Sequence, residues 1–361
     1  MMNNTNLESI TEPLICWFQK NARVLPWRER PLPYYVWISE IMLQQTRVEA
    51  VKPYFNRFIQ ALPRVQDLAE CPEDRLLKLW EGLGYYNRVR NMQKAARVLI
   101  EEYDGVLPAD YEKLLKLPGI GRYTAGAVAS IAYGIPVPAV DGNVLRVISR
   151  IIENDQDITK QSVKDEIEAM LLAVEPKECP GTFNQSLMEL GAVVCLPNGA
   201  PLCDRCPVRE LCQARIHEKL DVIPKKKEKQ KRRIEEKTVL VIRDGFHTVI
   251  QKRPSTGLLA GLYELPNLAG HLSRKEVLQY LKEQNFLPVR IQPLKEARHI
   301  FSHVEWRMTG YMVLVEEMEQ SESGMLVIEP ERTEEEYPIP AAFSAYARYL
   351  QIKLGQEKYE S

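Results

Sequence analysis

At 361 residues, the chain is longer than a single hydrophobic core usually serves, so two domains are expected. Its 45% hydrophobic and 27% charged residues are typical of a globular protein, and a net charge of −1 does not by itself indicate a nucleic-acid binder. The N-terminal segment MMNNTNLESITEPLICWF has neither a basic start nor a continuous apolar run, and no stretch approaches the ~20 apolar residues of a membrane span. We therefore expect a cytoplasmic protein with no membrane contact.

The first part of the chain, from about residue 7 to 214, has an almost wholly helical pattern that Pro and Gly interrupt. Apolar residues recur at helical spacing through 36–55 and again through 141–152. The pattern predicts an all-helical domain.

A tight turn lies between two of these helical patterns, in LKLPGIGRYTAG at residues 115–126. Gly119 and Gly121 permit backbone conformations that expose consecutive N–H groups at a helix N-terminus, where an anion such as a DNA phosphate is favoured. Lys116 and Arg122 flank the turn. An ordinary connection between helices uses the same glycines, so both interpretations remain open.

A proline-stiffened loop, YGIPVPAVDGN, ends at Asp141. Aspartate often caps the helix that follows it, which is the structural interpretation. The functional interpretation is a carboxylate held at a helix end, where it could stabilise positive charge that develops on a sugar. The two are compatible, because a helix cap is a rigid place for a catalytic group.

Four of the seven cysteines, Cys195, Cys203, Cys206 and Cys212, form a C-x7-C-x2-C-x5-C array in a Pro-rich loop. In a reducing compartment such spacing favours metal ligation over disulfides. Four thiolates suit either zinc or a cubane iron–sulfur cluster, and the spacing does not distinguish them.

The sequence KKKEKQKRR at 225–233 has seven basic residues in nine and reads as a solvated linker that could lie along DNA phosphates. After it the pattern alternates, with a hairpin predicted around Asp244 and Gly245, a helix over 273–285 and strand-like residues over 298–317. The expected organisation is a helical domain at 7–221, a basic linker at 222–236 and an α+β domain at 237–361.

The turn, the Asp141 loop and the cysteine array, in this order, resemble the helix–hairpin–helix DNA glycosylase superfamily with an iron–sulfur cluster. Within it, the chain is most similar to adenine glycosylases of the MutY type. The second domain resembles their Nudix-like recognition domain, through TGLLAGLYELP at 256–266 and FSH at 301–303. The other stretches that carry the resemblance are LPWR (25–28), VWISEIMLQQTRVE (36–49), WEGLGYYNRVRN (80–91), AVDGNV (139–144) and FNQSLMELGAVVC (183–195).

The resemblance implies a monomeric, nucleoid-associated enzyme that removes adenine mispaired with 8-oxoguanine or guanine from double-stranded DNA. Glu40 would be the general acid near adenine N7, and partial burial could keep it protonated near neutral pH. Asp141 would stabilise the oxocarbenium-like sugar, much as paired carboxylates do in glycosidases. Asn143 would orient water or Asp141, and Tyr123 would line the pocket near Glu40.

Other matching residues would bind the substrate. The extruded adenine would lie among Leu25, Trp27, Arg28 and Gln185. The vacated space in the duplex would be filled by Gln45 and Tyr85, with Thr46 on the damaged guanine and the glycine turn on the DNA backbone. The 8-oxoguanine would be read by Phe301, Ser302 and His303. Without the resemblance, Gln45 would be interpreted as an exposed polar residue, Tyr85 as a core aromatic and His303 as a structural or exposed histidine.

The resemblance also implies a [4Fe–4S] cluster on the four cysteines, which shapes a DNA-contacting loop and takes no part in hydrolysis. The chain departs from the family here, because its first cysteine gap has seven residues where six are common. The extra residue lies in the Gly/Pro stretch LPNGAPL, which carries no Lys or Arg. The contribution of this gap to phosphate contact is therefore in question.

The sequence argues against three alternative functions. Endonuclease III-like glycosylase/lyases, which act on oxidised pyrimidines, carry a Schiff-base lysine where Tyr123 stands, and a tyrosine has no amine. A Nudix hydrolase needs a Glu-rich metal-binding helix, but Glu276 and Glu283 do not form that motif. A catalytically inactive DNA-binding protein is disfavoured by the presence of both Glu40 and Asp141.

Overall fold

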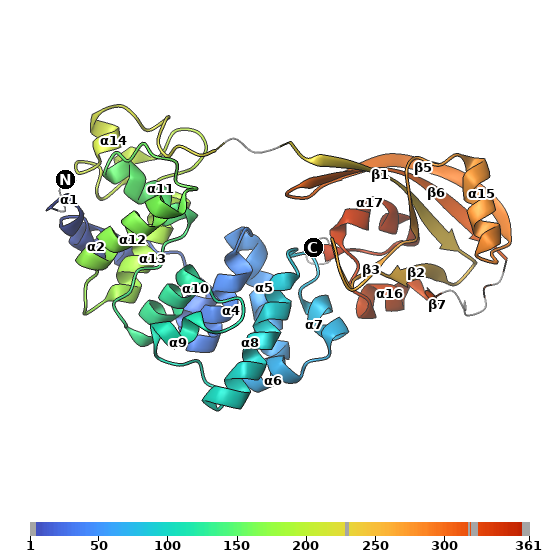
Figure 1. The fold of residues 1–361 in the computed structure, drawn as a ribbon, viewed down its shortest axis with the longest axis horizontal. Helices are drawn as coiled ribbons and strands as arrows, with labels where there is room; N and C mark the ends of the chain where they lie inside the picture. Colours follow the sequence, from blue (N-terminus) through green and yellow to red (C-terminus); the bar gives the residue numbers. More distant parts are fainter. Residues whose placement is uncertain (1–4, 228–230, 317, 319–323, 356–361) are drawn as a thin grey trace. The chain divides into compact units, whose positions relative to one another are not determined.

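The computed structural model describes residues 5–227, 231–316, 318 and 324–355 (Figure 1). Their contacts divide the chain into two compact units. The first unit contains residues up to 70 and residues 90–228, and the second contains residues 71–89 and residues from 229 onward. Part of the predicted basic linker, residues 228–230, lies outside the described residues.

The first unit is built from helices, as the sequence pattern predicted. Its α-helices are α1 (Thr5–Glu8), α2 (Thr11–Asn21), α3 (Pro26–Glu29), α4 (Pro33–Leu43), α5 (Val48–Ala61), α6 (Val65–Glu70), α8 (Asn87–Tyr103, whose first residues belong to the second unit), α9 (Tyr111–Leu115), α10 (Arg122–Ala127), α11 (Gly142–Ile151), α12 (Gln161–Val174), α13 (Pro180–Val193) and α14 (Gln213–Ile216). A π-helix, Val128–Ala132, continues α10, and a short 3₁₀ turn spans Cys203–Arg205.

One core of this unit forms where α2, α11, α12 and α13 meet. The apolar face predicted for α11 is buried there, with Val144, Val147 and Ile148 almost fully enclosed. Burying apolar area supplies most of the stabilisation, at about 25 cal/mol per Å². The polar ends of α11 and α13 are thereby held beside one another, which positions the site described below.

The helical pattern predicted over 36–55 is interrupted in the structure. Helix α4 ends at Leu43 and α5 begins at Val48, and between them Gln45 adopts a left-handed backbone with φ 59°. Such a conformation is unfavourable for a residue with a side chain, so surrounding contacts must hold it. The apolar pattern of the sequence continues through this break because the helices on both sides of it are buried in the same unit, α4 at almost every position and α5 along one face.

Helix α10 approaches the proline-stiffened loop so closely at Gly126 that there is no room for a Cβ atom. A Cβ atom there would lie 2.2 Å from the carbonyl oxygen of Pro138 and 3.0 Å from its carbonyl carbon. Both are backbone atoms, so the clash cannot be relieved by rotating a side chain. We expect Gly126→Ala to lower the free energy of unfolding by about 3 kcal/mol in chemical denaturation.

The matched control is Gly121→Ala, because nothing lies within 4 Å of the added Cβ and the backbone there has φ −95°. This variant should unfold within about 0.5 kcal/mol of the parent protein. Equal destabilisation by the two substitutions would contradict the close-approach argument.

The second unit is an α+β domain with a seven-stranded sheet. Its elements are α7 (Glu73–Leu79), β1 (Arg233–Arg243), β2 (Thr248–Lys252), β3 (Tyr263–Glu264), β4 (Asn267–Ala269), α15 (Arg274–Glu283), β5 (Pro288–Ile300), β6 (Val304–Val315), β7 (Met325–Ile328), α16 (Pro330–Glu336) and α17 (Ser344–Ala347), with 3₁₀ turns at Ala341–Phe343 and Arg348–Leu350. The predicted hairpin around Asp244 is confirmed by the antiparallel pairing of β1 with β2, and the predicted helix by α15, which starts at a Ser273 capping box.

The main path of the sheet has the order β3-β2-β1-β6-β5, with β1 and β6 parallel. Alternate residues of β1 point to opposite faces. Val239 and Val241 pack against the C-terminal segment that contains α17, whereas Leu240 and Ile242 pack against α15 (Figure 1). The sheet is therefore buried on both faces between helical layers.

Residues 71–89 belong to the second unit through specific polar contacts. The Lys78 ammonium lies 2.6 Å from the Tyr337 carbonyl oxygen, and the buried Glu81 carboxylate accepts from the Ile339 amide at 3.1 Å. Asp74 pairs with Lys252 at 2.9 Å.

These two units confirm the predicted fold class, a helical domain joined to an α+β domain. Within the described ranges, no helix combines the length and the hydropathy needed to span a bilayer.

Candidate active site

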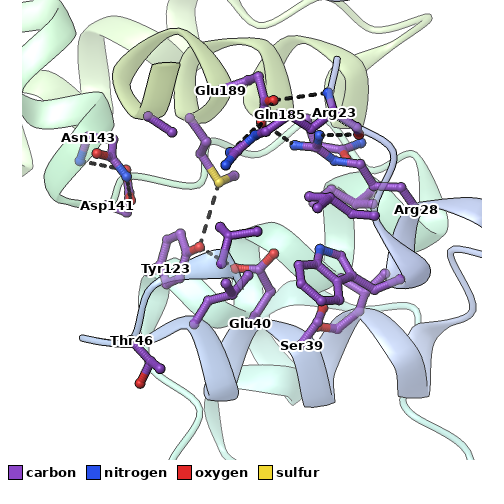
Figure 2. Close-up of a pocket in the computed structure, with 18 residues that line it drawn as sticks. Arg23, Arg28, Ser39, Glu40, Thr46, Tyr123, Asp141, Asn143, Gln185 and Glu189 are labelled. Atoms are coloured by element: carbon purple, nitrogen blue, oxygen red, sulfur yellow. Dashed lines mark hydrogen bonds and ion pairs between the residues drawn. The ribbon is translucent and has the colours of Figure 1, made fainter. Parts of the chain in front are cut away.

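A cavity of about 140 Å³ in the first unit brings together most of the residues predicted to act on the substrate. Figure 2 shows Asp141 and Asn143 on one side, Arg28 on the other, and Tyr123, Glu40 and Gln185 between them. The lining residues predicted from the sequence are Glu40, Tyr123, Asp141, Asn143, Leu25, Trp27, Arg28, Gln185 and Thr46. Segments from α3, α4, α10, α11 and α13 thus contribute to one pocket.

Glu40 is a buried carboxyl group on α4, with 6% of its surface exposed. Its pKa is raised to about 7, chiefly by burial and also by the nearby Asp141, while a hydrogen bond from the Tyr123 hydroxyl and the charge of Arg28 oppose the rise. The sequence had suggested only partial burial at the edge of an apolar stripe, and the structure encloses the residue fully. A carboxyl with this pKa can hold a proton near neutral pH and release it there.

Tyr123 lies beside Glu40, and its hydroxyl donates to the Glu40 carboxylate and lies 3.6 Å from the Met188 sulfur. Burial, with the neighbouring Glu40 and Asp141, raises the tyrosine pKa well above its ordinary value. Tyr123 is therefore a neutral hydrogen-bond donor at any physiological pH.

Asp141 is the N-cap of α11, so the capping interpretation describes its geometry. One carboxylate oxygen accepts from the amides of Asn143 and Val144 at 2.9 and 2.8 Å, and the other accepts from the Asn143 side chain at 2.7 Å. Burial raises the pKa of Asp141, but these hydrogen bonds favour its charged form. Asn143 is itself held by the Arg146 guanidinium, 2.9 Å from its Oδ1. The result is a rigid carboxylate that faces the pocket.

The opposite end of the pocket is organised by Glu189, which sequence reasoning missed. Its carboxylate accepts from Arg23 at 2.7 Å and from Arg28 at 2.9 Å, and Arg28 in turn donates to Gln185 at 3.1 Å. Burial alone would raise the pKa of Glu189, but these guanidinium contacts hold it down to about 2. The spacing of Gln185 and Glu189, four residues apart on one helix, could have indicated that both face the same space.

Leu25, Trp27 and Thr46 complete the pocket wall. Leu25 and Trp27 are buried, and the Trp27 ring packs edge-on against Phe55 with centroids 5.3 Å apart. Thr46 lies at the rim, in the break between α4 and α5.

The glycine turn contains one glycine with a left-handed backbone and one with an extended backbone. Gly119 has φ +77°, a left-handed conformation that favours glycine, and a Cβ there would meet Asn91. Gly121 is the N-cap of α10, with φ −95° and ψ 178°, an extended conformation that any residue adopts. Arg122 pairs with Asp165 and Glu168 on α12 rather than projecting alone beside the turn.

Two residues predicted to enter the duplex adopt strained conformations in their own units. Gln45 is exposed with φ 59° in the first unit, and Tyr85 is exposed with φ 49° in the second. Left-handed backbone at residues with side chains concentrates at functional sites. The exposure of Tyr85 shows that it is not a core aromatic, and left-handed backbone also occurs at six other non-glycine residues of the described chain.

The segment Phe301–His303 forms the tip of the β5–β6 hairpin in the second unit. Ser302 and His303 are exposed, and the Ser302 hydroxyl lies 2.8 Å from the Tyr85 hydroxyl. Phe301 packs against Trp306, with ring centroids 4.9 Å apart, which anchors the tip to the sheet.

The four clustered cysteines line one small cavity of about 20 Å³, walled by apolar residues of α11 and α13. The Cys195 sulfur accepts from Arg150 at 3.2 Å, and burial raises the pKa of the Cys206 thiol to about 12. Among the described residues, no three His, Cys, Asp or Glu side chains are arranged to hold a single metal ion.

A buried acid outside the pocket supports the loop that carries Asp141. The Asn184 side chain donates to the Val137 carbonyl at 2.9 Å and to Glu175 at 2.8 Å, and it accepts from the Ala139 amide at 3.0 Å. Burial raises the pKa of Glu175 to about 8, which the hydrogen bond from Asn184 only partly offsets.

We expect Glu175→Gln to become progressively more stabilising as pH rises from 5 to 9. The raised folded-state pKa means that the folded chain loses stability as pH rises from about 4.3, the unfolded value, through about 8. Glutamine keeps an acceptor for Asn184 and cannot ionise. Melting temperatures of both proteins across this range measure the effect, with Glu178→Gln at the exposed neighbour as control. A difference that does not vary with pH would contradict it.

Each of the two units matches a known protein family. Residues 38–171 match the family described as HhH-GPD superfamily base excision DNA repair protein, and residues 238–349 match the NUDIX domain. Two solved structures resemble the chain at 28% identity. They are a thermostable thymine-DNA glycosylase (TM-score 0.54, 59% of this chain and 98% of that one) and a trapped endonuclease III–DNA covalent intermediate (TM-score 0.52, 60% and 99%).

Curated relatives cover most of the chain. The adenine DNA glycosylase of Homo sapiens is 33% identical over 407 residues, which span 95% of this chain and 74% of that protein. The enzyme of the same name from Buchnera aphidicola subsp. Baizongia pistaciae is 32% identical over 308 residues, 84% of this chain and 86% of that one. With its base-excision helical unit and its Nudix-like unit, the chain belongs to the adenine DNA glycosylase family and is a DNA N-glycosylase of base excision repair.

Proposed function

We propose that this enzyme hydrolyses the N-glycosidic bond of adenine mispaired with 8-oxoguanine or guanine and leaves an abasic site. The observation that carries the proposal is one pocket containing two carboxyl groups in different environments, Glu40 enclosed with a pKa of about 7 and Asp141 bonded by three donors. Such pairs divide acid and electrostatic roles in glycoside hydrolysis. The mispaired adenine enters after leaving the base stack.

Glu40 acts as the general acid. Adenine is a poor leaving group as an anion, and protonation at N7 lets it depart neutral. The Tyr123 hydroxyl bonded to the Glu40 carboxylate orients the carboxyl toward the pocket. A positioned acid of matched pKa contributes about 10²–10⁴-fold in rate.

Asp141 acts on the sugar. Its charged form is supported by two backbone amides and by Asn143, so it can stabilise the oxocarbenium-like sugar or bond to it transiently. Asn143 keeps Asp141 in place and lies where it can orient the attacking water.

The enzyme is monofunctional under this proposal. A lyase needs an amine to form a Schiff base with the sugar, whereas Tyr123 is held neutral beside Glu40. The endonuclease III-like alternative has no observation in its favour at this position.

The base end of the pocket binds the extruded adenine. Leu25 and Trp27 offer apolar surface, while Arg28 and Gln185 offer polar atoms fixed by the Glu189 carboxylate. Because Arg28 is already paired with Glu189, it presents directed N–H groups with its charge compensated.

DNA contacts are assigned to exposed segments. Gln45 and Tyr85 would fill the space left by the base, and Thr46 would contact the damaged guanine. Gly119 and Gly121 would lie on the DNA backbone. The hairpin tip Phe301–His303 would read the 8-oxoguanine, and the Ser302–Tyr85 contact supports a joint role.

The four cysteines Cys195, Cys203, Cys206 and Cys212 line one cavity, which supports the proposal that they hold a common group. Four thiolates are the ligand set of a [4Fe–4S] cluster, and the family to which the chain belongs favours this cluster over zinc. When bound, the cluster would tie Cys195 at the start of this loop to Cys203, Cys206 and Cys212 without taking part in hydrolysis.

The deciding assay compares duplexes that contain adenine opposite 8-oxoguanine, adenine opposite guanine, or thymine glycol opposite adenine. We expect free adenine from the first two, with strand breaks only after alkali. Strand scission without alkali, or activity on thymine glycol alone, would overturn the proposal. A brown preparation that loses its colour when Cys206 is replaced by Ser would test the cluster separately.

A further inference from the structure

A second and larger cavity lies beyond the base end of the pocket, and we name it the rear chamber. It encloses about 640 Å³ between the end of α2, the π-helix at Val128–Ala132 and the first turn of α13. Gln19 and Val24 at its rim are exposed, Val24 by 79%, so the chamber opens to solvent. The residues that line both this chamber and the base pocket are Arg23, Leu25, Arg28, Ile131 and Gln185.

The partition between the two spaces includes two half-buried polar side chains. Arg28 donates to Gln185 at 3.1 Å, and its guanidinium lies 5.1 Å from the ring centroid of Phe18, which lines the chamber. Arg28 lies on the opposite side of the view from Asp141, and Gln185 lies between them (Figure 2). The sugar end therefore lies away from the Arg28 part of the partition. For a base to pass, Arg28 must give up its hydrogen bonds to Gln185 and Glu189, which needs side-chain rotation and no refolding of the backbone.

The chamber has donors that the fold leaves unused. Ser130 is only 2% exposed and lines the chamber, yet its hydroxyl has no hydrogen-bond partner among the described residues. Helix α13, 14 residues long, begins at the chamber wall without a side-chain cap, which leaves the first-turn N–H groups of Gly181 and Thr182 uncapped. A buried donor without a partner costs roughly 1–3 kcal/mol, so a ligand or water that accepts from it is favoured.

The chemistry of the lining matches a neutral heteroaromatic base. The two arginines of the lining, Arg23 and Arg28, are both paired with the Glu189 carboxylate, so neither guanidinium is available to hold a phosphate. Phe18 adds an aromatic face, and purine ring nitrogens are acceptors for the hydroxyl and amide donors.

We propose that the rear chamber is the exit route for the excised purine base, which passes Arg28 and Gln185 and leaves while the abasic DNA is still bound. The inference rests on the proposed function. After cleavage, the abasic sugar and the duplex occupy the Asp141 side of the pocket. A base that had to leave by that side would wait for the DNA to dissociate.

The test follows radiolabelled adenine after a single turnover on a mispaired duplex, with native gel filtration separating free label from protein–DNA complex. In the unaltered enzyme we expect label to leave while the DNA is still bound. Thr182→Trp and Ala22→Trp would each obstruct the chamber from opposite walls, at residues that do not line the base pocket. Both should excise within twofold of the parent rate and release adenine at least tenfold more slowly. Thr182→Ser is the matched control and should behave as the parent.

The outcomes are distinct. If the labelled adenine stays with the parent enzyme until the DNA dissociates, the exit route is contradicted by the parent enzyme alone. Release from either tryptophan variant at the parental rate also overturns it. Absence of excision by the parent enzyme contradicts the proposed function instead. As an independent readout, Ser130→Ala should weaken product inhibition by free adenine about 2–10-fold, the range of one hydrogen bond. Unchanged inhibition would show that Ser130 does not bind the adenine.

Discussion

The Asp141→Asn variant is expected to bind mispaired duplexes like the parent enzyme and to excise adenine at least about 10³-fold more slowly. Asparagine preserves the helix cap, because its side-chain oxygen can accept from the amides of Asn143 and Val144 as the aspartate does. What is lost is the negative charge opposite the developing positive charge on the sugar. Single-turnover excision and gel-shift affinity, measured on the same duplex, separate the two effects.

Asp110→Asn is the matched control, because Asp110 also caps a helix, accepting from the Lys113 amide at 3.0 Å, and does not line the pocket. It should excise at the parental rate. If Asp141→Asn keeps its turnover, the stabilising charge must come from another residue.

The Glu40→Gln variant is expected to lose about 10²–10⁴-fold in single-turnover rate and to lose the alkaline limb of the pH profile. The general acid must be protonated, and its pKa is raised to about 7. The parent rate should therefore be highest below pH 7 on this limb and fall about tenfold per pH unit above it. At low pH, protonation of Asp141 removes the stabilising charge, so the profile should be bell-shaped.

Glu175→Gln serves as the control, since Glu175 is also a buried acid of raised pKa but lies outside the pocket. Its profile should keep the alkaline limb of the parent. An alkaline limb that survives in Glu40→Gln would show that another group supplies the proton.

Much of the fold could be predicted from local patterns. The helical period of α11 and the alternation of β1 follow from which side chains must leave water, and the hairpin at Asp244 follows from turn residues between two such strands. The break after Leu43 could not be predicted, because α4 and α5 bury apolar faces in the same unit and the pattern runs through the interruption.

The pocket could be predicted only in part. Glu40 and Asp141 were identified through resemblance, since a glutamate on a helix and an aspartate before one are ordinary in isolation. Glu189 was missed because its role depends on Arg23 and Arg28, which lie more than 160 residues away in the chain.

What the sequence by itself determined is the chemistry available: two carboxyl groups, a tyrosine where a lyase has lysine, four clustered thiols and two patterns of apolar burial. The tertiary structure decided how these groups behave. Burial of Glu40 beside Asp141 raises its pKa to about 7. Burial also raises the pKa of Asp141, and three donors oppose that rise, while two guanidinium groups hold Glu189 ionised. Protonation depends on solvent exclusion and on neighbours brought together from distant segments, and these exist only once the helices have packed.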